Sequence, residues 1–213
     1  VESHNRPPGD LRLVYVNPIL CEWGSGLYYG DASGGRFSEY APIRRCGCGL
    51  AKLDHDGAFI YGAHFNLPGD IQTVPRGEIF ALVQLVDLLT PLSVITYVTD
   101  NKGLHDTFEK GPRAAYVTNN CDLYHIICIK ALSKGICITV RWMPSHLTLA
   151  ALGKNQHMSL DKDIPADVTA NDVLGNQHAD NLARLAASDA EVPLNVSSTY
   201  LYHAQLLERI QHR

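Results

Sequence analysis

The chain has 213 residues, which is the length of one large domain with additional segments. Its 46% hydrophobic and 19% charged residues are typical of a soluble globular protein, and no apolar run is long enough to cross a bilayer. The net charge of −4 excludes a strongly basic protein, and it argues against extensive phosphate contacts unless the acidic side chains are gathered at one place.

The cysteines and the start of the chain give expectations about its context. None of the six cysteines forms a CxxC pair, and no further ligands stand at zinc-site spacing. We therefore expect buried, reduced thiols and an intracellular location, in the nucleus or cytoplasm. No signal-peptide pattern opens the chain, and no membrane partner is expected. Pro7, Pro8 and Gly9 predict that residues 1–25 are an N-terminal extension or linker.

The next part of the chain has the patterns of three strands. Gly26–Ala32 is a short strand with Asp31 near its end. Cys46–Leu53 and Ala58–Phe65 are predicted to form a hairpin across the polar turn Asp54–Gly57. These strands should therefore meander through one sheet.

Helices and strands alternate in the rest of the chain. From Arg76, apolar residues recur at three- and four-residue spacing, which predicts an amphipathic helix that ends before Pro91. Ser93–Thr99 is an apolar run typical of a strand buried on both faces, and it leads into Asp100. The remaining expected elements are a helix at Asp122–Ser133, a strand at Cys137–Trp142, a helix at Asp172–Ala187 and a last helix at Tyr200–Gln211.

This order of elements indicates an α/β fold, in which a five-stranded mixed sheet carries helices on both faces. We expect the domain to occupy residues 26–190, followed by a C-terminal helical extension at 191–213. Active sites in such sheets lie at strand ends, and two of the predicted strands end in aspartate. Four acids stand out by position: Asp31 and Asp100 at strand ends, Glu78 in the first turn of a helix, and Asp180 in a later helix.

Each acid alone has an ordinary structural explanation, such as a favourable place at the start of a helix. The segments around them, however, resemble the type 1 ribonuclease H family, which includes the ribonuclease H domains of reverse transcriptases and retroelements. The similar segments follow in family order from about Tyr28 to Ala187. They are GDASGG (30–35), QTVPRGE (72–78), YVTD (97–100), NCDLY (120–124), RWMPSH (141–146) and GNQHADNLA (175–183).

The resemblance implies a ribonuclease H-like fold and an endonuclease that hydrolyses the RNA strand of RNA–DNA hybrids, leaving 5′-phosphate and 3′-hydroxyl ends. It implies two Mg²⁺ ions, for which Mn²⁺ can substitute, held by Asp31, Glu78, Asp100 and Asp180. Oxygen ligands suit Mg²⁺, and two ions about 4 Å apart suit phosphodiester hydrolysis. Besides the hybrid, the candidate partners are other domains of a reverse transcriptase or polyprotein.

The same resemblance gives roles to further residues. His146 is expected to assist proton transfer or product release. The chain departs from the family at Asn101, where serine is usual, and at residues 150–170, which read as an exposed insertion between His146 and Asp180. The expected substrate-binding residues are Ser33, Gly34, Thr73, Arg76, Asn101 and Asn120.

Two alternatives stay open. One is another two-metal nuclease or strand-transfer enzyme of the same fold, such as a transposase core or a resolvase. The other is a non-catalytic nucleic-acid-binding or docking module derived from this fold. A helix glutamate followed by two later aspartates disfavours the first, and the presence of all four acids disfavours the second.

Overall fold

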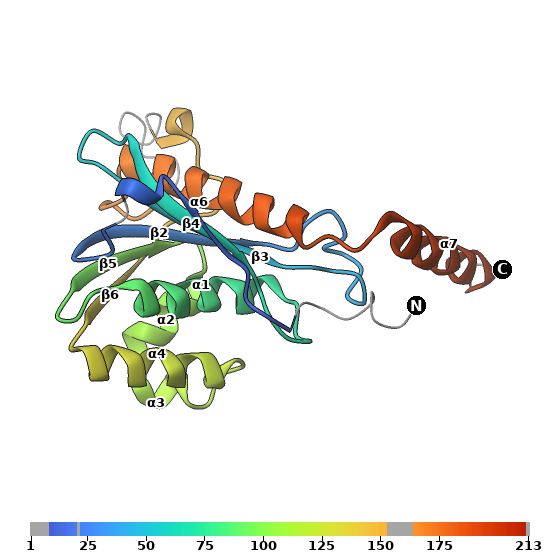
Figure 1. Cartoon of the computed structure of the whole chain (residues 1–213), viewed down its shortest axis with the longest axis horizontal. Coiled ribbons are helices and arrows are strands. Elements are labelled where there is room, and N and C mark those ends of the chain that lie inside the picture. The colour runs from blue at the N-terminus through green and yellow to red at the C-terminus, as the bar shows by residue number, and fades with distance from the viewer. Residues whose placement is uncertain (1–8, 21, 153–163, 212–213) are drawn as a thin grey trace.

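The computed structural model describes residues 9–20, 22–152 and 164–211, and it is an α/β structure in which helices cover both faces of one twisted sheet (Figure 1). Its strands are β1 (Leu13–Val16), β2 (Gly26–Ser33), β3 (Gly47–Leu53), β4 (Phe59–Asn66), β5 (Val94–Thr99) and β6 (Cys137–Trp142). Its helices are the 3₁₀ turn η2 (Pro18–Leu20), α1 (Val74–Leu88), α2 (Lys102–Lys110), α3 (Pro112–Ala115), α4 (Cys121–Lys134), α6 (Ala170–Asp189) and α7 (Leu194–Gln211).

The sheet is mixed, with the strand order β1-β4-β3-β2-β5-β6. Strands β2, β3 and β4 form the predicted antiparallel meander, and β5 and β6 run parallel to β2. The prediction of five strands was wrong, because β1 adds a sixth strand that pairs antiparallel with β4. This edge strand has only four residues, and Val14 and Tyr15 are exposed, so it carries no buried apolar pattern that the sequence could reveal.

Two apolar cores lie on opposite faces of the sheet. The larger core joins the sheet to α1 and α4, and Tyr28, Phe65 and Leu82 are among its fully buried members. The smaller core lies under α6 and includes Tyr29 and Val98. Figure 1 shows α6 on one face of the sheet, with α1, α2, α3 and α4 on the other.

Helix α6 packs closely against β3 because two strand residues have no side chain. A Cβ atom at Gly49 would lie 2.2 Å from the carbonyl oxygen of Ala179, and one at Gly47 would lie 2.1 Å from the amide nitrogen of Ala187. Any larger residue would push the helix away from the sheet. The two glycines therefore set the distance between the sheet and the helix that carries Asp180.

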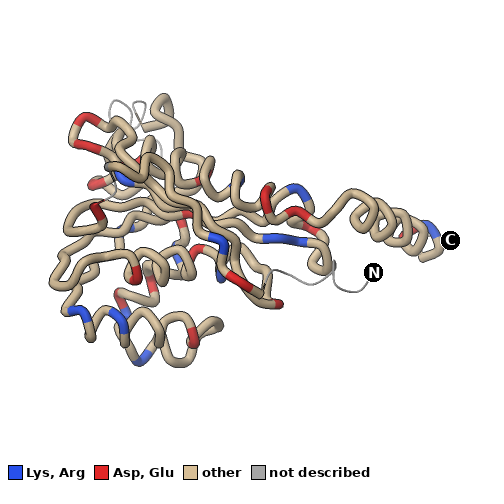
Figure 2. The backbone as a smooth tube through the Cα atoms, viewed as in Figure 1, with Lys and Arg blue, Asp and Glu red and all other residues tan. Residues whose placement is uncertain are grey.

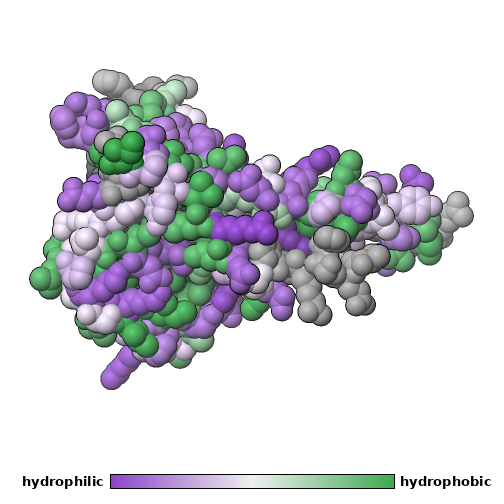
Figure 3. Space-filling model, in the orientation of Figure 1, coloured by the Kyte–Doolittle hydropathy of each residue, from purple (hydrophilic) through white to green (hydrophobic). Residues whose placement is uncertain are grey.

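Helix α7 extends away from the body of the protein (Figure 1). Its base rests on a small apolar cluster in which Phe37, Ile43 and Val192 are buried. The rest of the helix is largely exposed, and apolar side chains remain on its surface (Figure 3). The exposed apolar residues of this helix are Leu194, Tyr202, Leu206, Leu207 and Ile210.

The structure bears on three further sequence expectations. The five described cysteines are free, and Cys21 lies outside the described residues. Cys121 and Cys137 are exposed, so the expectation that all thiols are buried was wrong. The predicted insertion at 150–170 falls partly outside the described residues, and of its described ends Leu152 and Val168 are buried in the core under α6. Within the described ranges, no helix is long and apolar enough to span a bilayer.

Candidate metal centre and active site

Three carboxylates from three separate elements meet at one end of the sheet. Asp31 comes from β2, Glu78 from α1, and Asp100 directly follows β5; one oxygen of each lies within 4.8 Å of the others. The strand pairing accounts for part of this geometry. Because β2 and β5 are parallel and Tyr29 pairs with Val98, Asp31 and Asp100 both lie two residues further along neighbouring strands. It is the one cluster of three or more potential metal-binding side chains found among the described residues.

Glu78 reaches the cluster because α1 lies close to the sheet at Gly77. A Cβ atom at Gly77 would lie 2.7 Å from the Cβ atom of Ala32 on β2. The thiol of Cys48 on β3 also donates a hydrogen bond to the carbonyl oxygen of Gly77, with an S–O distance of 3.3 Å. The absent side chain and this hydrogen bond hold the first turns of α1 against β2 and β3, with Glu78 over the strand end.

Burial and mutual repulsion make these carboxyl groups weak acids. Burial, reinforced by the charge of Asp100, raises the pKa of Asp31 to about 7 and that of Glu78 to about 8. Burial also raises the pKa of Asp100, although the nearby His146 opposes this effect. A bound cation would favour the charged forms of these crowded carboxyl groups and relieve their mutual repulsion. The all-oxygen donor set of the cluster suits Mg²⁺ or Mn²⁺.

Asp180 lies beside this cluster and not within it. Its charge contributes to the raised pKa values of Asp31 and Asp100, which places it near both. Its carboxylate, however, forms an ion pair of 2.6 Å with Arg184, one turn further along α6, and its side chain is 28% exposed. The structure therefore brings three of the four predicted acids together and leaves the fourth adjacent, paired with a basic residue.

Two more polar residues border the cluster. His146 is exposed in the turn after β6, where its φ of 56° places it in the left-handed region, and its charge acts on Asp100. Asn176 of α6 is buried and hydrogen-bonds Asp100, while its Oδ1 has no partner within the described part of the chain. We did not predict Asn176 from the sequence, although it lies one helical turn before Asp180 and is part of the segment GNQHADNLA.

The predicted substrate-binding residues fall into two groups. Thr73 and Asn120 line a surface groove of about 760 Å³ at the N-terminus of α1, together with Arg44. Arg76 supports this groove from the side: its Nη1 donates to Asn120 Oδ1 at 3.0 Å, and its guanidinium also pairs with Asp122.

The other three predicted residues make contacts within the protein. Asn101 donates from its Nδ2 to the carboxylate of Glu78, and its Oδ1 accepts from the amide of Leu104 at 2.9 Å, capping α2. The hydroxyl of Ser33 accepts from the amide of Gly35 at 3.3 Å. Gly34 is buried, and a Cβ atom there would lie 2.8 Å from Ser38. Of these three residues, Asn101 is the one that acts directly on the carboxylate cluster.

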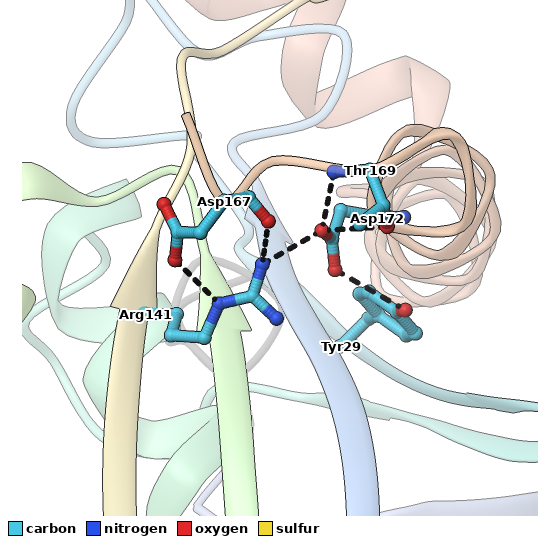
Figure 4. Close-up of polar contacts among 5 residues, drawn as sticks. All are labelled: Tyr29, Arg141, Asp167, Thr169 and Asp172. Atoms are coloured by element: carbon cyan, nitrogen blue, oxygen red, sulfur yellow. Dashed lines mark hydrogen bonds and ion pairs between the residues drawn. The ribbon is translucent and has the colours of Figure 1, made fainter. Parts of the chain in front are cut away.

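An ion-pair network around the buried Asp172 holds α6 beside the site (Figure 4). Asp172, in the first turn of the helix, is fully buried and accepts from Arg141 Nη2 at 2.8 Å and from both the amide and the hydroxyl of Thr169. Arg141 on β6 also binds Asp167, and Tyr29 on β2 donates to Asp172 at 3.4 Å. The start of α6 is thereby joined to two strands, which sets where its later turns place their side chains.

Figure 2 shows Lys and Arg interspersed with Asp and Glu along the described backbone. Arg44, which lines the groove, is partly exposed, and Lys102 at the start of α2 is exposed. Lys102 lies over the ring of Trp142, with its Nζ 4.9 Å from the ring centre. Any contact with an anionic ligand would therefore depend on a few local cations.

No protein-family model matches the chain, and no curated protein sequence matches it either. Solved structures do. The similar structures include ribonucleases H. Ribonuclease H1 from the archaeon Halobacterium salinarum is 17% identical, with 77% of this chain and 98% of that chain covered and a TM-score of 0.45. The ribonuclease H domain of prototype foamy virus is 14% identical, with 76% and 93% covered and a TM-score of 0.46.

The protease-reverse transcriptase of the same virus is also similar, at 14% identity and a TM-score of 0.46. The match covers 76% of this chain and 20% of that longer chain.

Proposed function

We propose that this protein is a metal-dependent nuclease that cuts the RNA strand of RNA–DNA hybrids. The observation that carries the proposal is the meeting of Asp31, Glu78 and Asp100 at one strand end. None of the three forms an ion pair with a lysine or arginine within the described ranges, unlike Asp172. Buried carboxylates without such partners are costly to a fold, so a function that needs them is the better explanation of their presence.

These three carboxylates would hold the divalent ions, with Asp180 at the side of the cluster. When bound, such ions activate water and neutralise charge on the phosphate undergoing hydrolysis. The chain's own residues orient this site: Asn101 holds Glu78, and Asn176 holds Asp100. His146, exposed beside Asp100, is placed to exchange a proton with solvent and the leaving group.

The groove at the N-terminus of α1 is the proposed site for the nucleic-acid backbone. Thr73 and Asn120 offer hydrogen-bonding groups there, and Arg44 offers a positive charge. Glu78 follows Thr73 by little more than one helical turn, so a phosphate in the groove lies close to the metal centre. Arg76 is engaged by Asp122, so its proposed part is to hold Asn120 in place. Recognition of the 2′-hydroxyl would direct cleavage to the RNA strand.

The test is cleavage of labelled duplexes in Mg²⁺ and in EDTA. The proposal predicts that the RNA strand of a hybrid is cut in Mg²⁺ only, giving 5′-phosphate ends, while RNA–RNA and DNA–DNA duplexes stay intact. Cleavage or joining of duplex DNA would instead favour a nuclease or strand-transfer enzyme of other specificity. Binding of the hybrid without cleavage in any divalent metal would favour a non-catalytic binding module.

A further inference from the structure

The side chain of Tyr97 on β5 has a hydroxyl group without a visible role. It is fully buried, and its oxygen has no hydrogen-bond partner within the described residues. Tyr28, which pairs with Tyr97 across β2 and β5, is equally buried but donates to the carbonyl oxygen of Gly24 at 2.8 Å. Tyr29 donates to Asp172. Buried hydroxyls normally have partners, so an unpaired one calls for an explanation.

The hydroxyl of Tyr97 lies directly beneath the carboxylate cluster. A Cβ atom at Gly30 would lie 1.9 Å from this oxygen, so the hydroxyl fills the space that a side chain at Gly30 would take, one residue before Asp31. Tyr97 and Glu78 both lie on the side of the sheet that α1 covers. After burial, the charges of Glu78 and Asp31 are the largest causes that raise the pKa of Tyr97, so its hydroxyl is near both and keeps its proton.

The position of this proton donor suggests its partner. Glu78 already accepts one hydrogen bond from the partly buried side chain of Asn101. A carboxylate that binds a cation is charged and gains from further donors on its remaining lone pairs. Tyr97 is a fully buried donor, and its hydroxyl has no acceptor within the described residues.

We propose that Tyr97 is a positioning residue of the metal centre, whose hydroxyl donates a hydrogen bond to the carboxylate of Glu78 when the site holds its ions. This inference rests on the proposed function, because it requires that the cluster binds divalent cations. It gives a role to a buried hydroxyl that has no partner among the described residues. The role belongs to ion binding and not to substrate contact, since the side chain is inaccessible.

The test compares Tyr97→Phe with the matched control Tyr28→Phe by calorimetric titration with Mg²⁺. Each substitution removes one hydroxyl from a buried ring on the same face of neighbouring strands. We expect Tyr97→Phe to weaken Mg²⁺ binding about tenfold, equivalent to about 1.4 kcal/mol. The metal-free protein should keep or gain stability, because the lost hydroxyl had no partner. Tyr28→Phe should lower stability and leave Mg²⁺ affinity unchanged, because its hydroxyl is bonded far from the cluster.

Hybrid cleavage gives a second measurement, in which Tyr97→Phe should need about tenfold more Mg²⁺ while KM for the hybrid stays the same. Equal Mg²⁺ affinity of the wild type and Tyr97→Phe overturns the inference and leaves the proposed function standing. An equal loss of Mg²⁺ affinity in Tyr97→Phe and Tyr28→Phe also overturns it, since a general destabilisation of the core would then be the cause. A wild-type protein that binds no Mg²⁺ overturns both proposals. If Mg²⁺ binding is weakened in Tyr97→Phe alone but the wild type does not cleave the hybrid, the inference is supported and the proposed substrate is refuted.

Discussion

The buried carboxyl group of Asp31 should make the metal-free protein less stable at high pH, and Asp31→Asn should remove that effect. The unfolded chain loses the proton of Asp31 near its ordinary pKa of 3.8, whereas the folded protein loses it near 7. Ionisation is thus harder in the folded state, so stability falls as the pH rises from about 4 to 7, and the whole loss is present above 7.

The size of the effect follows from the same values. One pKa unit corresponds to about 1.36 kcal/mol, so a rise from 3.8 to about 7 sets a ceiling of about 4 kcal/mol. Asp31, Glu78 and Asp100 repel one another when charged, so the pKa rise of Asp31 is not a property of that residue alone. The free energy gained by removing one charge is therefore divided among the three groups. We therefore expect Asp31→Asn to stabilise the metal-free protein by about 2 to 4 kcal/mol at pH 8 and by almost nothing at pH 4.

The assay is urea unfolding in EDTA at both pH values, followed by circular dichroism. The control is Asp56→Asn, in the β3–β4 turn, whose side chain is 76% exposed and which should change stability little at either pH. Saturating Mg²⁺ at pH 8 should reverse the order, because ions that bind only the folded wild type stabilise it. The reasoning is refuted if Asp31→Asn is less stable than the wild type at pH 8 in EDTA, or if the difference is the same at both pH values.

Three further predictions concern catalysis, the α6 anchor and packing. Asp100→Asn should reduce hybrid cleavage by several orders of magnitude and His146→Ala by about 10²-fold in single-turnover assays; the reverse order would contradict the metal assignment. Asp172→Asn should cost about 3 kcal/mol in urea unfolding because it breaks a buried pair, whereas Asp167→Asn, 63% exposed, should cost less than about 1 kcal/mol; equal costs would count against the network. Gly49→Ala should lower stability by about 3 kcal/mol, because the added Cβ meets the backbone of α6; an unchanged unfolding midpoint would show that the helix can move away freely.

The sequence predicted the strands β2 to β6 and the helices α1, α4, α6 and α7, including β6, which buries only Val140. Strand β6 was predicted with its observed bounds, and α1 begins two residues before the predicted Arg76 because Pro75 is accommodated in its first turn. Helix α2 was missed, because it buries only Leu104 and Thr107 and depends on the cap that Asn101 provides. Strand β1 was missed because its hydrogen bonds to β4, and not an apolar face, keep it in the sheet.

The candidate site was predictable where local sequence motifs fix strand and helix ends. Asp31 lies near the end of β2 and Asp100 directly follows β5, as predicted from their motifs. Glu78 lies in the second turn of α1 and not in the first as predicted, because the helix begins at Val74, but its carboxylate still meets the other two. The pairing of Asp180 with Arg184 depends on side-chain conformation on α6, and no motif encodes it. The place of Tyr97 beneath the cluster depends on the absent side chain of Gly30 on a neighbouring strand, and only the folded arrangement reveals that contact.

The central claim is that Asp31, Glu78 and Asp100 together bind divalent cations. Anomalous diffraction from a crystal of the wild-type protein soaked in Mn²⁺ tests it most directly, because the signal locates the ion independently of any activity. The account predicts an anomalous peak within coordination distance of carboxylate oxygens from all three residues, and its loss in crystals of Asp31→Asn. A wild-type crystal with ordered Mn²⁺ elsewhere and none at this cluster would contradict the account.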